Sequence, residues 1–173
     1  IDLEKLANHK GSAFGSIGEH PQPTTEQFEN DLFMAFRDLD PSRPVWLENE
    51  SKNIGKVNIP DGLWNVMRAS VLYAIEVSQS VRLSRILRYY SEPVDIALLK
   101  QSFERIYKRI GGLEFQKAMK ALEARDLATA ASIALVYYDK AYRFQQEAWP
   151  QAYVRVLDRC DDVKLTASRL MQS

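Results

Sequence analysis

The stretch Arg43–Gly55, R-P-V-W-L-E-N-E-S-K-N-I-G, is the part of the sequence around which we expect the rest of the chain to be organised. Its apolar run Val45–Leu47 predicts a short buried strand, and Pro44 suits the first position of a strand, where a missing N–H costs least. Glu48 and Glu50 follow directly, and carboxylates just past the carboxyl end of a strand are where open α/β sheets place their chemistry. The local spacing also fits a solvated loop after a core strand, which is the commoner arrangement.

The whole chain has the composition of a globular protein. Its 173 residues, 46% hydrophobic and 27% charged, are enough for a domain with its own core. No apolar run approaches the roughly 20 residues of a membrane span, and the first residues lack the pattern of a signal peptide. The single Cys160 leaves no internal disulfide and suits a reducing compartment, so we expect a cytoplasmic protein.

Charge is unevenly distributed along the sequence. Residues 1–77 carry 7 Lys and Arg against 12 Asp and Glu, whereas residues 78–173 carry 16 against 11. A basic second half permits an anionic partner such as a phosphate compound or RNA. Solvated helix faces explain the same charges and are the commoner origin of such a pattern.

The first half of the sequence predicts strands that alternate with helices. After a long glycine-rich loop over residues 8–23, Thr24 and Gln27 fit a capping box at the start of a helix. The strand Val45–Leu47 follows, and the nearly continuous apolar run Val71–Val77 predicts a strand buried on both faces. A helix follows each strand, and this order favours βαβ units and a parallel sheet.

The second half predicts a helical subdomain. Apolar residues at helical spacing mark three helices over residues 94–110, 113–125 and 126–149. A last strand at Tyr153–Leu157 and a terminal helix capped by Asp161 or Asp162 follow. The sequence therefore predicts an α/β protein with a helical C-terminal part.

Glu48 and Glu50 form the first candidate site. In a nucleotide-binding α/β fold, one acid at a strand end can hold Mg²⁺ through water and another can orient a nucleophile. Both roles need a phosphate-binding loop, and the glycine-rich loop is not of the Walker A type, because no Gly-Lys-Ser/Thr follows at the required spacing. His9, Lys10 and Ser12 in that loop can still contact an anion; otherwise the loop is a plain connection.

Two basic groups are further candidates. Arg82 and Arg85, three residues apart on the helix after the second predicted strand, suit a phosphate or diphosphate. Lys108 and Arg109, with tyrosines nearby, could line an RNA surface. Solvent-exposed basic helix faces also account for both groups. The two histidines are too isolated to predict a metal site, and Cys160 without a partner predicts a packed side chain.

Three segments carry a more specific signal: L-A-N-H-K-G-S-A-F-G (Leu6–Gly15), F-E-N (Phe28–Asn30) with L-D-P-S-R-P-V-W-L-E-N-E-S-K-N-I-G (Leu39–Gly55), and I-P-D-G-L-W-N-V-M-R-A (Ile59–Ala69). Together with Y-Y-D at Tyr137–Asp139, they resemble the P-loop domain of bacterial tRNA 2-selenouridine synthase. The similarity runs in order, without large gaps, from the first residue to about Phe144, and the first two motifs are long and unusual.

The resemblance implies an enzyme that replaces the sulfur of wobble 2-thiouridine in tRNA with selenium from selenophosphate, through an intermediate geranylated by geranyl diphosphate. It implies a partial P-loop NTPase-like parallel sheet with helices on both faces over residues 1–90. A helical subdomain over 91–150 and a final strand and helix over 151–173 complete the expected fold. The expected partners are tRNA and a small-molecule diphosphate. Selenophosphate and geranyl diphosphate are expected as substrates, and Mg²⁺ is a candidate ion for such a site.

This sequence has no counterpart of several features of the family: the rhodanese-like domain with its cysteine, the first strand and the Walker A loop. Cys160 does not replace that cysteine. We therefore expect a fragment that is inactive alone and has an exposed sheet edge that another chain can cover. The residues carried over are His9, Lys10, Gly11 and Ser12 as a substrate-side loop, Glu48, Glu50 and Ser51 as the acidic site, and Arg82 and Arg85 by position after a strand.

Two other functional classes stay open. A P-loop kinase or NTPase relative without an RNA substrate has the same features, and only a rhodanese-like domain upstream would favour the tRNA enzyme over it. A non-catalytic helical interaction module would place Glu48 and Glu50 far from Ser12 and Arg82.

Overall fold

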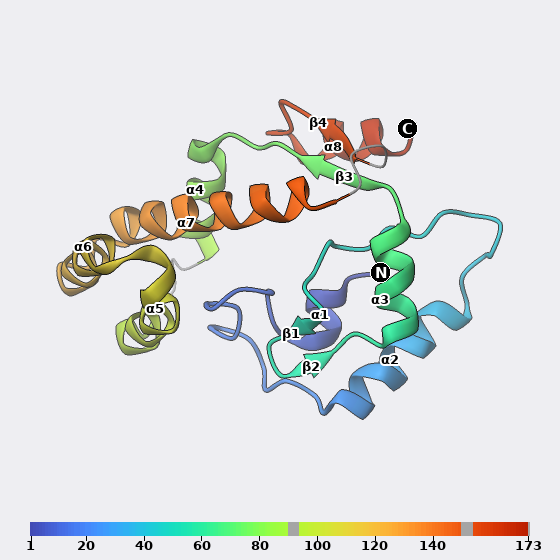
Figure 1. Cartoon of the computed structure of the whole chain (residues 1–173), viewed down its shortest axis with the longest axis horizontal. Coiled ribbons are helices and arrows are strands. Elements are labelled where there is room, and N and C mark those ends of the chain that lie inside the picture. The colour runs from blue at the N-terminus through green and yellow to red at the C-terminus, as the bar shows by residue number, and fades with distance from the viewer. Residues whose placement is uncertain (90–93, 150–153, 173) are drawn as a thin grey trace. The chain divides into compact units, whose positions relative to one another are not determined.

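The structure, a computed structural model, describes residues 1–89, 94–149 and 154–172. Within these ranges the chain is an α/β protein made mostly of helices, with small two-stranded sheets (Figure 1). It divides into two compact units, Ile1–Ser70 and Val71–Ser173. The boundaries expected near residues 90 and 150 lie outside the described residues, so the division into three parts stays a prediction.

The first unit holds three helices and a hairpin: α1 (Leu3–Ala7), α2 (Thr25–Arg37), β1 (Asn53–Ile54), β2 (Val57–Asn58) and α3 (Asp61–Ala69). The sequence predicted the start of α2 correctly, because the Thr24 hydroxyl accepts from the main-chain nitrogen of Gln27 at 3.1 Å. Only this half of the capping box forms in the described residues, because no bond joins the Gln27 oxygen to the Thr24 main-chain nitrogen, while the Gln27 amide nitrogen donates to Asp31 at 2.8 Å.

The core of the first unit gathers apolar side chains from all of these elements. Leu3 and Ala7 of α1, Phe28 of α2, and Ile54 and Val57 of the hairpin are fully buried. Burying a large apolar side chain stabilises a fold by about 1.5–3 kcal/mol. The short α1 therefore depends on packing rather than on its own helix propensity.

The predicted strand at Val45–Leu47 is wrong: these residues form a loop. Val45 and Trp46 are 41% and 38% exposed, and only Leu47 packs against the core. The Trp46 carbonyl accepts from the main-chain nitrogen of Ile1 at 2.8 Å and pairs with no strand. An apolar run of three residues is too short to distinguish a strand from a loop with one buried side chain.

The βαβ unit predicted from the strands Val45–Leu47 and Val71–Val77 does not form, because the first of these segments is a loop. The sheet found within residues 1–70 is instead an antiparallel hairpin. Asn53 pairs with Asn58 and Ile54 with Val57. Gly55 follows β1 with a φ of +61°, the left-handed conformation that a two-residue hairpin turn requires. The sequence N-I-G-K-V-N carries this turn signal, although its composition equally predicts a linker with extended character.

The second unit contains the remaining elements: β3 (Leu72–Ile75), α4 (Gln79–Tyr89), α5 (Ile96–Ile110), α6 (Gly112–Glu123), α7 (Leu127–Glu147), β4 (Val154–Leu157) and α8 (Val163–Leu170). All seven were predicted to within a few residues. Asp95 and Asp126 cap α5 and α7, and Asp162 rather than Asp161 caps α8.

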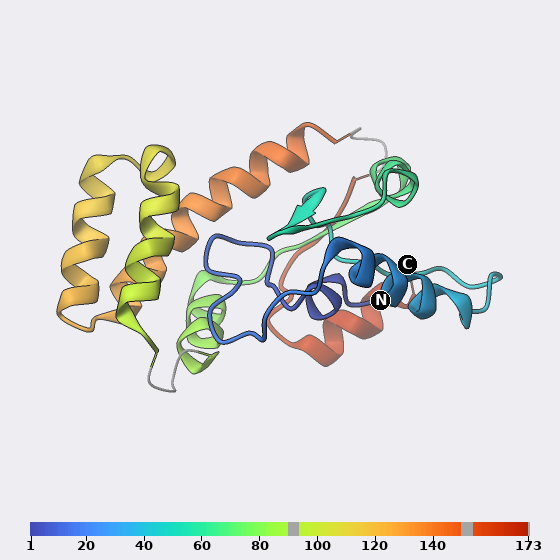
Figure 2. The ribbon, with the colours of Figure 1, turned by 90° about the horizontal axis from the view of Figure 1, so that it is seen from below.

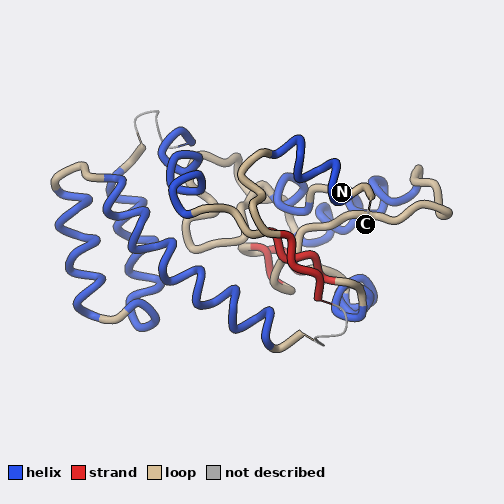
Figure 3. Tube along the Cα trace, turned by 90° about the horizontal axis from the view of Figure 1, so that it is seen from above, coloured by secondary structure: helices blue, strands red, loops and turns tan. Residues whose placement is uncertain are grey.

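The strands β3 and β4 pair in parallel, with Leu72 opposite Val154 and Ile75 opposite Leu157 (strands red in Figure 3). This pair is the parallel sheet of the described chain. Ile75 is 46% exposed and Val156 is 53% exposed. The prediction that the first of these strands is buried on both faces is therefore wrong, because no described helix covers these side chains.

The helices α5 and α6 form an antiparallel hairpin beside α7 (Figure 2). Of the apolar stripe that predicted α5, their shared core contains Leu99, Phe103 and Ile106, all less than 8% exposed, while Ile110 is half-buried. Leu122 of α6 and Leu135 of α7 are buried as well. Gly111, with a φ of +84°, lets the chain reverse between α5 and α6.

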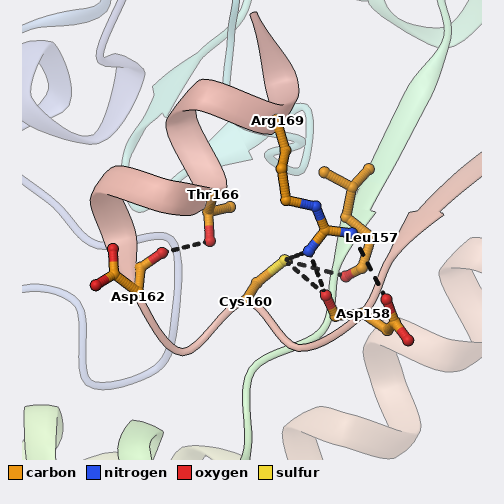
Figure 4. A network of polar contacts seen from close by, with 6 residues as sticks. All are labelled: Leu157, Asp158, Cys160, Asp162, Thr166 and Arg169. Carbon is orange, nitrogen blue, oxygen red and sulfur yellow. Dashed lines mark hydrogen bonds and ion pairs between the residues drawn. The ribbon is translucent and has the colours of Figure 1, made fainter. Parts of the chain in front are cut away.

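Cys160 is packed, as predicted, in the turn between β4 and α8 (Figure 4). Its thiol donates to the Leu157 carbonyl at 3.3 Å, and its main-chain nitrogen donates to the Glu76 carbonyl at 2.9 Å. Arg169 of α8 donates to the Asp158 carbonyl at 2.6 Å and covers the thiol. None of the helices in the described ranges has the length and apolarity needed to span a membrane.

Candidate functional site

The glycine-rich loop after α1 is a folded segment held by its own main chain. Asn8 ends α1 in the left-handed conformation, with a φ of +47°. The main-chain nitrogen of Lys10 donates to the Gly15 carbonyl at 3.0 Å, and that of Gly15 donates to the Ser12 carbonyl at 2.9 Å. The Ser12 hydroxyl accepts from the nitrogen of Phe14 at 3.2 Å. These bonds fix the path of residues 10–15.

His9 anchors the loop rather than facing solvent. It is 8% exposed, and its main-chain nitrogen donates to the Glu4 carbonyl at 3.0 Å. A Cβ on Gly15 would lie 2.7 Å from the imidazole Cε1, and a Cβ on Gly55 would lie 2.8 Å from Cδ2. The imidazole therefore fits between two glycines, one from the loop and one from the hairpin turn.

Gln22 ties the same three segments together. Its amide nitrogen donates to the carbonyls of Ala7 and Ile54, both at 2.9 Å. Its amide oxygen accepts from the main-chain nitrogen of Lys56 at 2.8 Å. Because one side chain bonds the end of α1 and both sides of the hairpin turn, the loop and the hairpin form one rigid base.

Glu50 lies directly on this base, over Gly11. A Cβ on Gly11 would lie 2.3 Å from Oε2 of Glu50, well inside van der Waals contact. Gly11 also has a φ of +60°, which favours glycine for a second reason. The structure thus brings together the loop that contains His9–Ser12 and the acidic loop that contains Glu48–Ser51, which lie some forty residues apart in the sequence.

Glu4 of α1 completes an acidic cluster with Glu50 and Glu48. Burial, with the nearby carboxylate of Glu4 and then that of Glu48, raises the pKa of Glu50 to about 7. Burial is also the main cause that raises the pKa of Glu4 and of Glu48. The hydrogen bond between Glu4 and Glu50 lowers the pKa of Glu4 and raises that of Glu50, so the protonated Glu50 is the donor to the Glu4 carboxylate.

Glu48 serves the local structure as well as the cluster. Its Oε2 accepts from the main-chain nitrogen of Leu3 at 2.9 Å, in the first turn of α1. A carboxylate at that place satisfies one of the free N–H groups of the helix start. Ser51 is exposed, and its main-chain N–H bonds to the Glu50 carboxyl.

Lys10 brings a positive charge to the cluster from the glycine-rich loop. Its side chain is partly exposed, its ammonium lies 2.8 Å from Oε1 of Glu19, and its charge lowers the pKa of Glu4. In the described ranges, no group of three or more His, Cys, Asp or Glu side chains has the arrangement of a metal site. Mg²⁺ at the acidic loop stays a prediction.

The structure gives Arg82 and Arg85, on α4 in the second unit, intramolecular partners. Arg82 makes a bidentate pair with Asp139 of α7, at 2.5 and 2.8 Å. Arg85 donates to the carbonyl of Asp161 at 2.8 Å. No local pattern in the sequence indicated these partners. To bind a phosphate, each arginine would have to give up its present partner or use N–H donors that the partner leaves free.

Lys108 and Arg109, the residues predicted to face RNA, lie in the last turn of α5, where both are exposed. Arg109 donates to the hydroxyl of Tyr137 on α7 at 3.2 Å. The side chains that sequence reasoning missed are Glu4, Gln22 and Asp139. Only Asp139 carried a signal, because it belongs to the Y-Y-D segment of the resemblance.

The chain matches one family of known proteins over most of its length. A family model described as the tRNA 2-selenouridine synthase AAA domain matches residues 1–166. The match includes both loops of the cluster and both units. It agrees with the resemblance identified from the motifs.

Curated relatives carry the name tRNA 2-selenouridine synthase. One from Shewanella oneidensis is 29% identical over 85% of this chain and 47% of its own length. One from Chromohalobacter salexigens is 31% identical over 91% of this chain and 50% of its own length, and one from Hahella chejuensis is 34% identical over 72% and 38%. The chain spans about half the length, or less, of the curated relatives it matches. No solved structure matches it.

Proposed function

The chain belongs to the tRNA 2-selenouridine synthase AAA-domain family, and from this premise we propose that it is part of an enzyme that forms 2-selenouridine in tRNA. The family match over residues 1–166 is the observation that carries the proposal. The named activity of the relatives is a tRNA modification, so the substrate class is RNA and the site of action is the cytoplasm.

The proposed reaction replaces the sulfur of wobble 2-thiouridine with selenium. In a first step the sulfur takes a geranyl group from geranyl diphosphate, and diphosphate leaves. In a second step the selenium of selenophosphate forms a bond to C2 of the base, and the sulfur leaves with its geranyl group. Hydrolysis of the Se–P bond then releases phosphate and leaves 2-selenouridine.

Glu50 is the residue that we assign to proton transfer in this reaction. The departing thiolate needs a proton, and a carboxyl with a pKa of about 7 holds one near neutral pH. General acids work best when their pKa lies near the working pH. The small exposed fraction of Glu50, 9%, suits a group that reacts only at a closed site.

The loop over residues 9–12 is assigned to the anionic donor. Lys10 has a partly exposed side chain and directly precedes Gly11, the residue on which Glu50 rests. A cation there favours a selenophosphate or diphosphate group close to the Glu50 carboxyl. Glu48 acts as a positioning residue, since it holds the start of α1, the helix that carries Glu4.

The proposal is tested on the complete protein in a bacterial host that lacks its own 2-selenouridine synthase. Nucleosides from the host's tRNA are measured by mass spectrometry after growth with selenite. We expect 2-selenouridine with the wild-type protein, a loss of at least about ten-fold with Glu50→Gln, and no change with Glu26→Gln, an exposed acid at the start of α2.

Two results would contradict the proposal. Absence of 2-selenouridine with a wild-type protein that is folded and abundant would refute the assigned activity and favour a phosphate-transferring relative without an RNA substrate. Full activity of Glu50→Gln would remove only the role of Glu50.

A further inference from the structure

A groove lies between the end of α5, the start of α6 and one face of α7, entirely inside the second unit. Its volume is about 560 Å³. Along α7 its lining extends from Ala128 to Lys140, which is about 18 Å of helix at 1.5 Å per residue. A groove of this length is longer than a single phosphate group needs.

Two cations line the groove without a carboxylate partner in the described ranges. They are Arg109 from α5 and Lys140 from α7, both exposed. Glu114 is the acid among the lining residues, and the ammonium of Lys117 compensates it at 2.6 Å. The groove therefore presents two uncompensated positive charges to solvent, and an anion that binds there displaces no ion pair.

Tyr137 adds a directed donor between these charges. Its hydroxyl oxygen accepts from Arg109 at 3.2 Å, so its own proton remains available to a ligand. The hydroxyls of Thr129 and Ser132, in contrast, donate to Asp126 and to the Ala128 carbonyl within α7.

The floor between the polar groups is apolar. Ile110, Ile133 and Val136 line it, and Val136 is 48% exposed. The ring of Tyr137 lies next to them and contacts Tyr138 edge-on, with ring centroids 4.8 Å apart. These features match the groups of a nucleic-acid strand. The spaced cations suit its charged phosphates, the phenol can donate a hydrogen bond, and the apolar side chains suit the faces of bases and riboses.

We propose that this groove binds a single-stranded segment of the RNA substrate, with phosphates at Arg109 and Lys140 and a base or ribose against Val136 and Tyr137. The inference rests on the proposed function for the presence of an RNA substrate. Charge complementarity supports this occupant, since residues 78–173 carry 16 Lys and Arg against 11 Asp and Glu. Lys108, although adjacent in sequence, does not line the groove.

The test measures tRNA binding by the complete protein at several salt concentrations. The variants are Arg109→Ala with Lys140→Ala, and Tyr137→Phe, which keeps the ring. The matched control is Lys120→Ala with Lys164→Ala, which removes two exposed cations, one from α6 and one from α8, outside the groove lining. Far-ultraviolet circular dichroism confirms that each protein is folded.

We expect the groove double variant to bind tRNA about ten-fold more weakly near physiological salt. Its salt slope should be shallower by about 1.4, because each phosphate neutralised on a single strand contributes about 0.7 and the variant neutralises two fewer. Tyr137→Phe is expected to weaken binding by about two- to five-fold, because its ring cannot donate the hydrogen bond. The control is expected to bind like wild type.

The outcomes separate this inference from the proposed function. Wild-type protein that does not bind tRNA would remove the RNA premise of both. Tight tRNA binding that is equal in the groove double variant and the control would overturn the groove alone. Inorganic diphosphate is added as a competitor. If it displaces tRNA completely from the wild-type protein and has no effect on tRNA binding by the groove double variant, the groove binds a small phosphate ligand, and the inference is also overturned.

Discussion

Gly11→Ala tests the contact that joins the two loops of the candidate site. The substitution has two costs in the structure. Alanine at a φ of +60° costs about 1–2 kcal/mol, and its Cβ would lie 2.3 Å from Oε2 of Glu50, so that carboxyl has to move. Moving it breaks the hydrogen bond to Glu4, which costs about 1 kcal/mol more. We expect a total loss of about 2–3 kcal/mol in the free energy of unfolding.

A double-mutant cycle separates the two costs. The free energies of unfolding of wild type, Gly11→Ala, Glu50→Ala and the double variant are measured by urea denaturation, followed by tryptophan fluorescence. Because the clash is absent without the Glu50 side chain, Gly11→Ala should cost about 1 kcal/mol less in that background. The matched control is Gly111→Ala, which has a φ of +84° but no atom within 4 Å of the added Cβ.

The control should show backbone strain alone, with no dependence on Glu50. If the two substitutions at Gly11 and Glu50 are additive to within about 0.3–0.5 kcal/mol, then Glu50 does not lie over Gly11. That result would also separate the two loops on which the candidate site depends.

Other contacts lead to three more predictions. Burial and Glu4 raise the pKa of Glu50 to about 7 from the ordinary 4.5. The folded protein therefore binds an extra proton between these values, and the free energy of unfolding should fall as pH rises from one to the other, by up to about 3 kcal/mol. Urea denaturation at several pH values should show a flatter dependence for Glu50→Gln. Arg82→Lys keeps the charge but loses the bidentate bond to Asp139, so thermal unfolding should show a loss of about 1 kcal/mol, and an unchanged midpoint would refute the pair. Thr24→Ala removes the cap of α2 and should cost about 1 kcal/mol in chemical denaturation, whereas Ser42→Ala, in an exposed loop, should cost little.

The second unit was predictable because its elements are marked by local signals. Asp126 caps α7, and Gly111 separates α5 from α6. Helix periodicity and capping act over a few residues, so a single sequence displays them. Both strands of the parallel pair were predicted, but their pairing with each other, its register and their exposure were not.

The first unit was harder because its loops are fixed by contacts between distant residues. Nothing near Val45 shows that Trp46 pairs with the start of the chain rather than with a strand. Gln22 bonds α1 to the hairpin turn through an ordinary polar side chain, a role that its sequence context does not mark. Glu50 was predicted as a site residue from its place after a strand, but it follows a loop and owes its raised pKa to burial and to Glu4.

The most direct test of the role assigned to Glu50 is the pH dependence of selenium incorporation by the purified complete protein with saturating tRNA, geranyl diphosphate and selenophosphate. If Glu50 supplies the proton, the wild-type rate should fall above a pH of about 7, the pKa of that carboxyl. Glu50→Gln should react slowly and lose this limb of the profile, while Glu26→Gln should keep it. Superimposable profiles for wild type and Glu50→Gln would contradict that role.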